Sequence, residues 1–253
     1  MNGILSLIFM LTINSLDKSV TYNIANYIID HVDDIEKKNI REISKDSYTS
    51  TTSIMKFCQL LGFDSYNDFK SMFVYTVRDR MRQLHRKVKE ESVDELLNEL
   101  IHLSNDISLD KLSYIETIDK LVDIIHEKKE IYIYGAVFPI NLCVSFAEDM
   151  TIMGVPVHFV QVGYTTGELP KQKGVHLIVT YTGRFIKQRE LHYIDIVDNA
   201  EVSALISREQ EYVGNVDIVL PFPHTKSIDY DDPILLFILD MIKLRYYEKY
   251  YKE

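Results

Sequence analysis

The stretch from residue 50 to residue 63, Ser-Thr-Thr-Ser-Ile-Met-Lys-Phe-Cys-Gln-Leu-Leu-Gly-Phe, decides how the whole sequence is interpreted. Ser50 suits an N-cap, because its hydroxyl can accept hydrogen bonds from the free N–H groups of a first helical turn. Gly62 suits the position just after a helix end. The apolar residues between them recur at i, i+3, i+4 and i+7, which is the spacing of one helix face: Ile54, Phe57, Cys58 and Leu61. The stretch therefore predicts a short helix that is buried on one side.

The opposite face of this helix is polar, and such side chains can contact phosphates and base edges in a major groove. A second short helix is expected at 40–45, joined to the first by the tight connection 46–49. Together the two form the helix-turn-helix pattern of DNA-binding proteins; an ordinary helical hairpin in an all-α core is the alternative. On the first interpretation, the residues that face a double-stranded DNA operator are Lys45, Ser50, Thr51, Thr52, Ser53, Lys56 and Gln59.

The run 40–63, followed by Tyr-Asn-Asp-Phe-Lys at 66–70, resembles the N-terminal domain of the RpiR family of transcriptional regulators. That family typically shows the signature Ser-x-x-Thr-Ile-x-Arg-Phe-Cys-x-x-Leu-Gly-Phe, and here Ser53 stands for the Thr and Lys56 for the Arg. Tyr48 occupies the place of the family's turn glycine, so a positive φ there would cost about 1–2 kcal/mol. The resemblance implies a sequence-specific regulator of genes for carbohydrate metabolism.

Length and charge distribution predict two domains, since a typical domain holds about 100–150 residues and the chain has 253. The net charge of −10 is uneven, because residues 1–90 hold 13 Lys and Arg against 11 Asp and Glu. A head with a charge of +2 offers few phosphate contacts, so we expect a homodimer or higher homo-oligomer that presents several heads. The expected boundaries are a helix-turn-helix domain at 1–88, a helical linker at 89–110 and an α/β domain at 111–253.

A basic run closes the long helix expected at 65–88. We leave two interpretations open for it: a solvated charged face, or a flank that contacts DNA phosphates. Its members are Arg78, Arg80, Arg82, Arg86, Lys87 and Lys89.

The second half of the sequence alternates short β-rich runs with helical segments, expected at 140–153, 185–199 and 233–251. Such alternation indicates a parallel sheet covered on both faces. We therefore expect an α/β fold overall, with an all-α helix-turn-helix domain followed by a doubly wound α/β/α domain. Its five parallel strands are expected at 131–135, 157–161, 175–180, 202–206 and 216–220.

Ligands of a doubly wound sheet bind at the carboxyl ends of its strands. The layout resembles the sugar isomerase (SIS) domain, which follows the head in the RpiR family and binds phosphosugar effectors. Its Ser-x-Ser-Gly-x-Thr loop corresponds to 180–185, where the last Thr is Phe185, and its Gly-x-Gly-x-Ser loop corresponds to 135–139, where Val137 and Pro139 replace the second Gly and the Ser. Weak phosphosugar binding, another anionic effector and an occluded pocket all stay open. The residues expected to bind a ligand are Gly135, Thr180, Thr182, Gly183 and Arg184.

Enzyme motifs are sparse, and we expect no enzyme, no cofactor and no metal site. The eight His residues lack metal-ligand spacing, and no P-loop or G-x-S-x-G motif is present. Glu148 and His192 would be the acid/base pair of a sugar-phosphate isomerase with a helical head, one alternative to a regulator; a regulator whose second domain is a ligand-free dimeriser is another.

The apolar segment 1–13 has no basic start or cleavage site and is too short to span a bilayer. It is therefore expected to be a packing helix. The two cysteines fit a reducing compartment, so we expect a cytoplasmic protein with no membrane partner.

Overall fold

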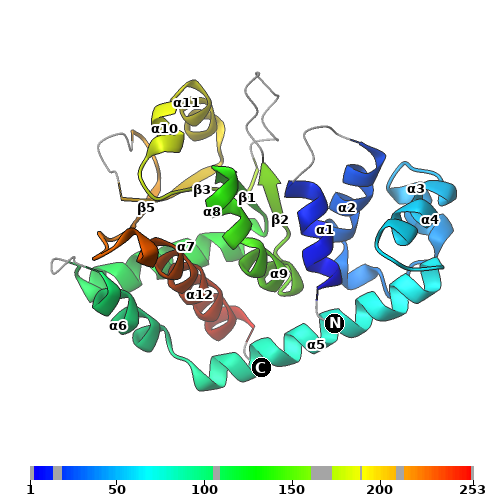
Figure 1. Ribbon diagram of the computed structural model, residues 1–253, viewed down its shortest axis with the longest axis horizontal. Helices are drawn as coiled ribbons and strands as arrows, with labels where there is room; N and C mark the ends of the chain where they lie inside the picture. Colours follow the sequence, from blue (N-terminus) through cyan, green and yellow to red (C-terminus); the bar gives the residue numbers. More distant parts are fainter. Residues whose placement is uncertain are drawn as a thin grey trace.

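The computed structural model describes residues 3–13, 19–104, 109–160, 173–188, 190–208 and 214–251. The first half of the chain is helical (Figure 1), with α1 (Ile4–Ile13), α2 (Val20–Asp30), η1 (Val32–Asp34), α3 (Ile40–Asp46), α4 (Thr51–Leu60), α5 (Tyr66–Glu90), α6 (Val93–Leu103) and α7 (Lys111–Lys128). The second half alternates strands and helices: β1 (Ile131–Gly135), α8 (Val137–Leu142), α9 (Val144–Ile152), β2 (Val157–Val160), β3 (Val175–Thr180), α10 (Arg184–Gln188), α11 (Glu190–Asn199), β4 (Val202–Ser207), β5 (Ile218–Pro221), η2 (Ile228–Tyr230) and α12 (Asp231–Tyr250).

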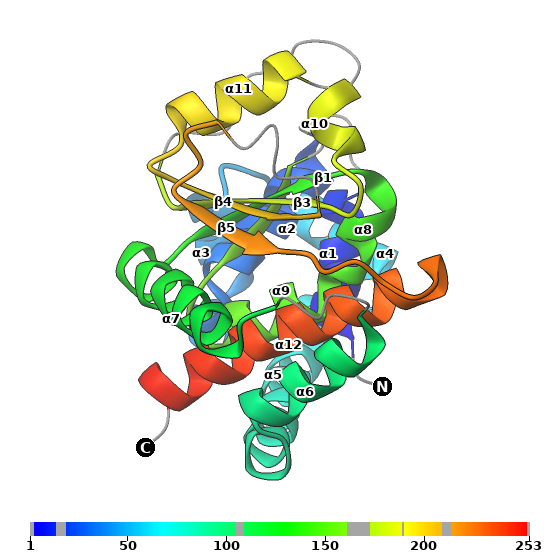
Figure 2. The ribbon, with the colours of Figure 1, turned by 90° about the vertical axis from the view of Figure 1, so that its left-hand side faces the viewer.

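The five strands form one parallel sheet in the order β2-β1-β3-β4-β5. Helices cover both faces: α10 and α11 lie on one side, and α7, α9 and α12 lie on the other (Figure 2). Tyr134, Ile178 and Leu205 pack beneath α10 and α11, whereas Ile133 and Val179 belong to the core of the opposite face. The predicted α/β class with five parallel strands is confirmed.

One helix expected to be continuous is broken in the structure. The segment expected at 140–153 begins earlier and divides into α8 and α9 at Cys143, whose N–H donates to the oxygen of Ile140, only three residues back. Apolar residues continue across this break, so the hydrophobic pattern did not reveal it. The segment expected at 185–199 contains α10 and α11, and residue 189 between them lies outside the described residues.

The helix-turn-helix pattern is confirmed, with a cap at the start of each helix. Asn39 and Glu42 form a reciprocal capping box at α3. The backbone N–H of Ser53 donates to the hydroxyl of Ser50 at 3.0 Å, which caps α4. Tyr48, in the turn where the family has a glycine, has a φ of 54°. A non-glycine residue in this left-handed conformation costs about 1–2 kcal/mol.

The end of α4 also follows the sequence pattern. Gly62 has a φ of 89°, and the N–H of Phe63 donates to the oxygen of Cys58 at 2.9 Å. This is the hydrogen bond of a glycine-terminated helix. It turns the ring of Phe63 onto Phe69 of α5, with 5.7 Å between the ring centres.

The helix-turn-helix part packs directly on the sheet part. Helix α1 was expected to be a packing helix, and it lies against α2, α9 and β2. The ring of Phe9 meets Phe159 edge-on at 5.7 Å, and the hydroxyl of Ser6 donates to Glu148 at 2.8 Å. A single hydrophobic cluster runs from α1 through α5 to α12. The exact domain boundaries at 88 and 110 stay predictions.

A search of the described helices finds none long and apolar enough to cross a membrane.

Candidate functional site

Helix α4 is held by its apolar stripe. Ile54, Phe57 and Cys58 are buried, and α4 packs on α2, α3 and α5. Leu61 lies just beyond the helix and is only partly buried. Burial raises the pKa of the Cys58 thiol to about 11, so the thiol stays neutral and apolar at physiological pH. One face of α4 is therefore fixed and the other is left for a partner.

The predicted DNA-facing residues divide into two groups. Ser50 and Ser53 are engaged with each other, since their hydroxyl oxygens lie 2.9 Å apart and Ser50 also caps the helix. Lys45 is exposed in the last turn of α3. The other four are exposed, and none has a side-chain hydrogen bond or ion pair within the described parts of the chain: Thr51, Thr52, Lys56 and Gln59.

Tyr48 was not predicted as part of this surface. Its side chain is 97 % exposed, directly before the start of α4. The sequence contained part of the signal, because Tyr48 stands in the turn between the two helices of the helix-turn-helix pattern. The nearby carboxylate of Asp46 is paired with Lys38 at 2.8 Å. The hydrogen bond from Lys38 lowers the pKa of Asp46, so this carboxylate stays charged and paired with Lys38.

The strand register brings the predicted ligand-binding residues to one edge of the sheet. Gly135 pairs with Val179, and Thr180 pairs with Ser207. Thr180 is buried, whereas Thr182 is exposed. Gly183 has a φ of 66°, which explains a glycine there, and Arg184 is exposed at the start of α10. The structure thus groups these side chains near the ends of β1 and β3.

Two features of this edge have structural explanations. A β-carbon on Gly135 would lie 2.4 Å from the oxygen of Val179, so glycine allows the ends of β1 and β3 to approach. Phe185, where the SIS pattern has a Thr, is 7 % exposed and packs with Tyr134 and Ile178. Phe185 therefore fills core volume.

The chain's own carboxylates occupy the same edge, which sequence reasoning missed. Arg208, at the end of β4, donates to Asp231 at 2.7 Å, and Thr225 donates to the same oxygen at 2.8 Å. The hydroxyl of Tyr181 donates to Asp232 at 2.9 Å. Acidic residues favour helix N-termini, so the pair at 231 and 232 indicated the start of α12. Nothing in the sequence indicated which residues would pair with these two carboxylates.

Glu148, the suggested acid of an isomerase pair, is engaged with the helical head through Ser6. Burial raises the pKa of its carboxyl group. The side chain of its suggested partner, His192, lies outside the described residues. Across the residues that the structure describes, no group of three or more His, Cys, Asp or Glu is arranged to hold a metal ion.

The capped helix pair, the tight turn and the exposed polar face of α4 define a helix-turn-helix protein, here joined to a parallel α/β sheet. The family model for the helix-turn-helix domain of the rpiR family matches residues 10–77. The chain therefore carries an rpiR-family helix-turn-helix domain.

Three solved structures share part of this architecture. A hypothetical protein of Methanococcus jannaschii, whose structure was taken to infer a 3-hexulose-6-phosphate isomerase, is 19 % identical over 63 % of this chain and 91 % of its own, with a TM-score of 0.48. The NanR protein of Vibrio vulnificus, in complex with ManNAc-6P, is 12 % identical over 99 % of this chain and 94 % of its own, with a TM-score of 0.43. Another hypothetical protein is 13 % identical over 67 % and 91 %, with a TM-score of 0.46. No curated protein sequence matches the chain.

Proposed function

We propose that the chain is a sequence-specific, DNA-binding transcriptional regulator of carbohydrate-metabolism genes that acts in the cytoplasm, with α4 as its reading helix. The observation that carries this proposal is the face of α4 opposite its buried stripe, where Thr51, Thr52, Lys56 and Gln59 are exposed without a partner in the described chain. This face belongs to the part of the chain that matches the rpiR helix-turn-helix model.

The chemistry of this face suits the major groove. A lysine donates to the O6 and N7 acceptors of guanine, and a glutamine amide can pair with N6 and N7 of adenine. Lys56 and Gln59 are three residues apart, so they lie on the same side of α4. The hydroxyls of Thr51 and Thr52, in the first turn, are placed for phosphate oxygens. Because each head supplies few phosphate contacts, we propose that the protein works as a homodimer that reads two half-sites.

Lys56→Ala is expected to weaken operator binding by about 1–3 kcal/mol, the typical effect of losing a specific base contact. The thermal unfolding midpoint should stay unchanged, because the Lys56 side chain is exposed. Fluorescence anisotropy with a labelled operator, selected beforehand from random duplexes, measures the affinity. The matched control is Lys120→Ala, which removes the same charge from the exposed surface of α7. Equal affinities of a folded Lys56→Ala variant and wild type would remove α4 from the reading role.

We propose further that a phosphosugar or related anionic metabolite binds at the edge formed by Gly135, Thr180, Thr182, Gly183 and Arg184. Two threonine hydroxyls and a guanidinium supply donors for an anion. The carboxylates of Asp231 and Asp232 weigh against anion binding at this edge. Asp231 already accepts from Arg208 and Asp232 from Tyr181, so these two donors are taken. An effector must therefore rely mainly on Arg184 for charge.

Calorimetric titration with a panel of sugar phosphates tests this second proposal. Binding should weaken by about tenfold or more in Arg184→Ala, since a hydrogen bond to a charged group contributes about 1.5–3 kcal/mol. Undiminished binding by the variant would show that the anion does not use Arg184. Absence of heat from every sugar phosphate would contradict the effector proposal and leave the α/β half as a dimeriser.

A further inference from the structure

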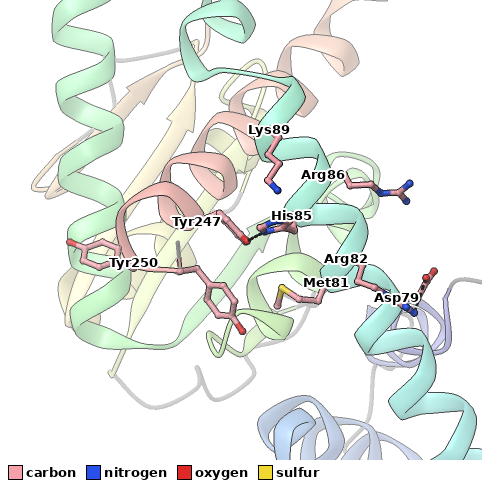
Figure 3. A pocket seen from close by; sticks show the side chains of 9 residues that line it. Asp79, Met81, Arg82, His85, Arg86, Lys89, Tyr247 and Tyr250 are labelled. Atoms are coloured by element: carbon pink, nitrogen blue, oxygen red, sulfur yellow. Dashed lines mark hydrogen bonds and ion pairs between the residues drawn. The ribbon is translucent and has the colours of Figure 1, made fainter. Parts of the chain in front are cut away.

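A groove of about 1130 Å³ lies where the C-terminal half of α5 meets the last turns of α12 (Figure 3). Its walls carry cationic and aromatic side chains together, including Arg82, His85, Arg86, Lys89, Tyr247 and Tyr250. The residues on its two sides are more than 150 positions apart in sequence, so only the fold brings them together.

The cations of this groove are poorly neutralised. Within the described ranges, neither Arg86 nor Lys89 has a carboxylate at ion-pair distance. Arg82 lies 3.4 Å from Asp79, but 67 % of the Arg82 side chain is exposed, and such surface pairs contribute little. A cluster of like charges repels itself and destabilises the folded chain slightly. In a chain with a net charge of −10, this cluster is a local reversal of sign.

The cations follow one side of α5. Arg78, Arg82 and Arg86 are spaced at i, i+4 and i+8, which places them on one face of the helix. Figure 3 shows Arg82 and Arg86 on the outer side of α5, with Lys89 and His85 closer to α12. A second hollow of about 630 Å³ includes Arg78 and Arg82 and continues the groove toward α4. Arg78 is paired with Glu36 at 2.8 Å, so we define the cationic track as Arg82, Arg86 and Lys89, which span about 10 Å at 1.5 Å per residue.

The tyrosine wall opposite the track is fixed by its own contacts. The hydroxyl of Tyr247 lies 2.5 Å from Nδ1 of His85, and the hydroxyl of Tyr250 donates to Asp123 at 2.6 Å. The tyrosines therefore hold α12 in place beside the track while their ring edges remain part of the groove surface. Since the tyrosine wall is already ordered, a ligand would lose little entropy in fixing that wall.

We propose that this cationic track binds the phosphodiester backbone of DNA, as a contact separate from the base-reading face of α4. Cations spread over about 10 Å match a short row of phosphates, which recur every 3.4 Å of axis along each strand. A single small anion would instead need donors that converge on one point. The inference rests on the proposed function, because DNA is the partner, and it adds a second, sequence-independent site on α5.

The test is the salt dependence of binding to a duplex of unrelated sequence, measured by anisotropy with full-length protein. Neutralising a phosphate contact changes the slope of log K against log salt by about 0.9. The triple variant Arg82→Gln/Arg86→Gln/Lys89→Gln should therefore lose about 2–3 units of slope and bind at least about tenfold more weakly at 0.1 M salt. The control, Lys111→Gln/Lys120→Gln/Lys226→Gln, makes the same change in net charge on exposed lysines elsewhere.

Each outcome decides the question. A smaller slope of log K against log salt in the triple variant at 82, 86 and 89 (the groove variant), with an unchanged slope in the control, supports the proposal. A slope kept by the groove variant, while Lys56→Ala still weakens operator binding, overturns the proposal and leaves the proposed function standing. Absence of DNA binding by wild type overturns both. The groove variant could instead lose binding to poly-glutamate while its salt slope for DNA equals that of wild type. That result would assign the track to an acidic protein and overturn the DNA proposal. If the triple variant unfolds, Arg86→Gln and Lys89→Gln singly should each lose about 0.9 units.

Discussion

Asp149→Ala is expected to lower the free energy of unfolding by about 3–5 kcal/mol, the effect of leaving a buried charge without its partner. The Asp149 side chain is fully buried and joins two helices: it accepts from Arg80 of α5 at 2.6 and 3.0 Å and from Lys243 of α12 at 2.8 Å. Burial alone would lower the pKa of Lys243, but Asp149 and Asp240 raise it, so the ammonium stays charged. Without Asp149, that ammonium keeps only Asp240, at 2.6 Å.

Urea denaturation followed by circular dichroism measures this loss, and Asp119→Ala is the matched control. Asp119 also holds two cations, Arg245 and Lys249, but about a quarter of its side chain is exposed. Pairs of this kind contribute about 0–1 kcal/mol. Equal losses in the two variants would show that Asp149 is not a buried anchor. Because Arg80 belongs to α5, the anchor also fixes the helix that supports α4 and carries the cationic track.

The second large effect is a loss of stability at alkaline pH that depends on His158. This ring lies in β2 and its side chain is 12 % exposed, with Nε2 3.1 Å from Asp30 of α2 and 3.5 Å from Glu130 before β1. Tyr132 stacks on it, and Asn26 lies 3.3 Å from Nδ1. Burial alone would lower the pKa of His158, but the two carboxylates outweigh it and raise the pKa to about 9.

A histidine whose pKa is raised by folding stabilises the fold fully below its unfolded pKa of about 6.5. That contribution is lost as pH rises through about 9. A shift of this size corresponds to roughly 3 kcal/mol. We expect the free energy of unfolding to fall between pH 6.5 and 9 in wild type, and to be flat over that window in His158→Gln. Identical pH profiles for the two proteins would contradict the assignment.

The sequence predicted what depends on local spacing. The stripe of Ile54, Phe57 and Cys58 identified α4, and the β-rich runs identified all five strands. Both patterns depend only on residues two to four positions apart in the sequence. The break at Cys143 was missed because apolar residues continue across it.

The sequence did not predict the features that form where segments distant in the chain meet. Arg208 and Asp231 meet at the sheet edge because β4 ends where α12 begins, and nothing in their neighbours marks that pairing. The cationic track was visible as a basic run, but its opposite wall comes from Tyr247, which is more than 150 residues away in the sequence. The roles of the predicted DNA-facing and ligand-binding residues stay predictions.

Selection of bound duplexes from a random DNA pool, with wild type and Lys56→Ala in parallel, tests most directly whether α4 reads base sequence. Each pool is sequenced, and the preference at every position is compared between the two proteins. We expect wild type to enrich a defined motif, and Lys56→Ala to lose the preference at one position of each half-site while keeping the rest. Enrichment of the same motif with the same preference at every position by the folded variant would contradict the account.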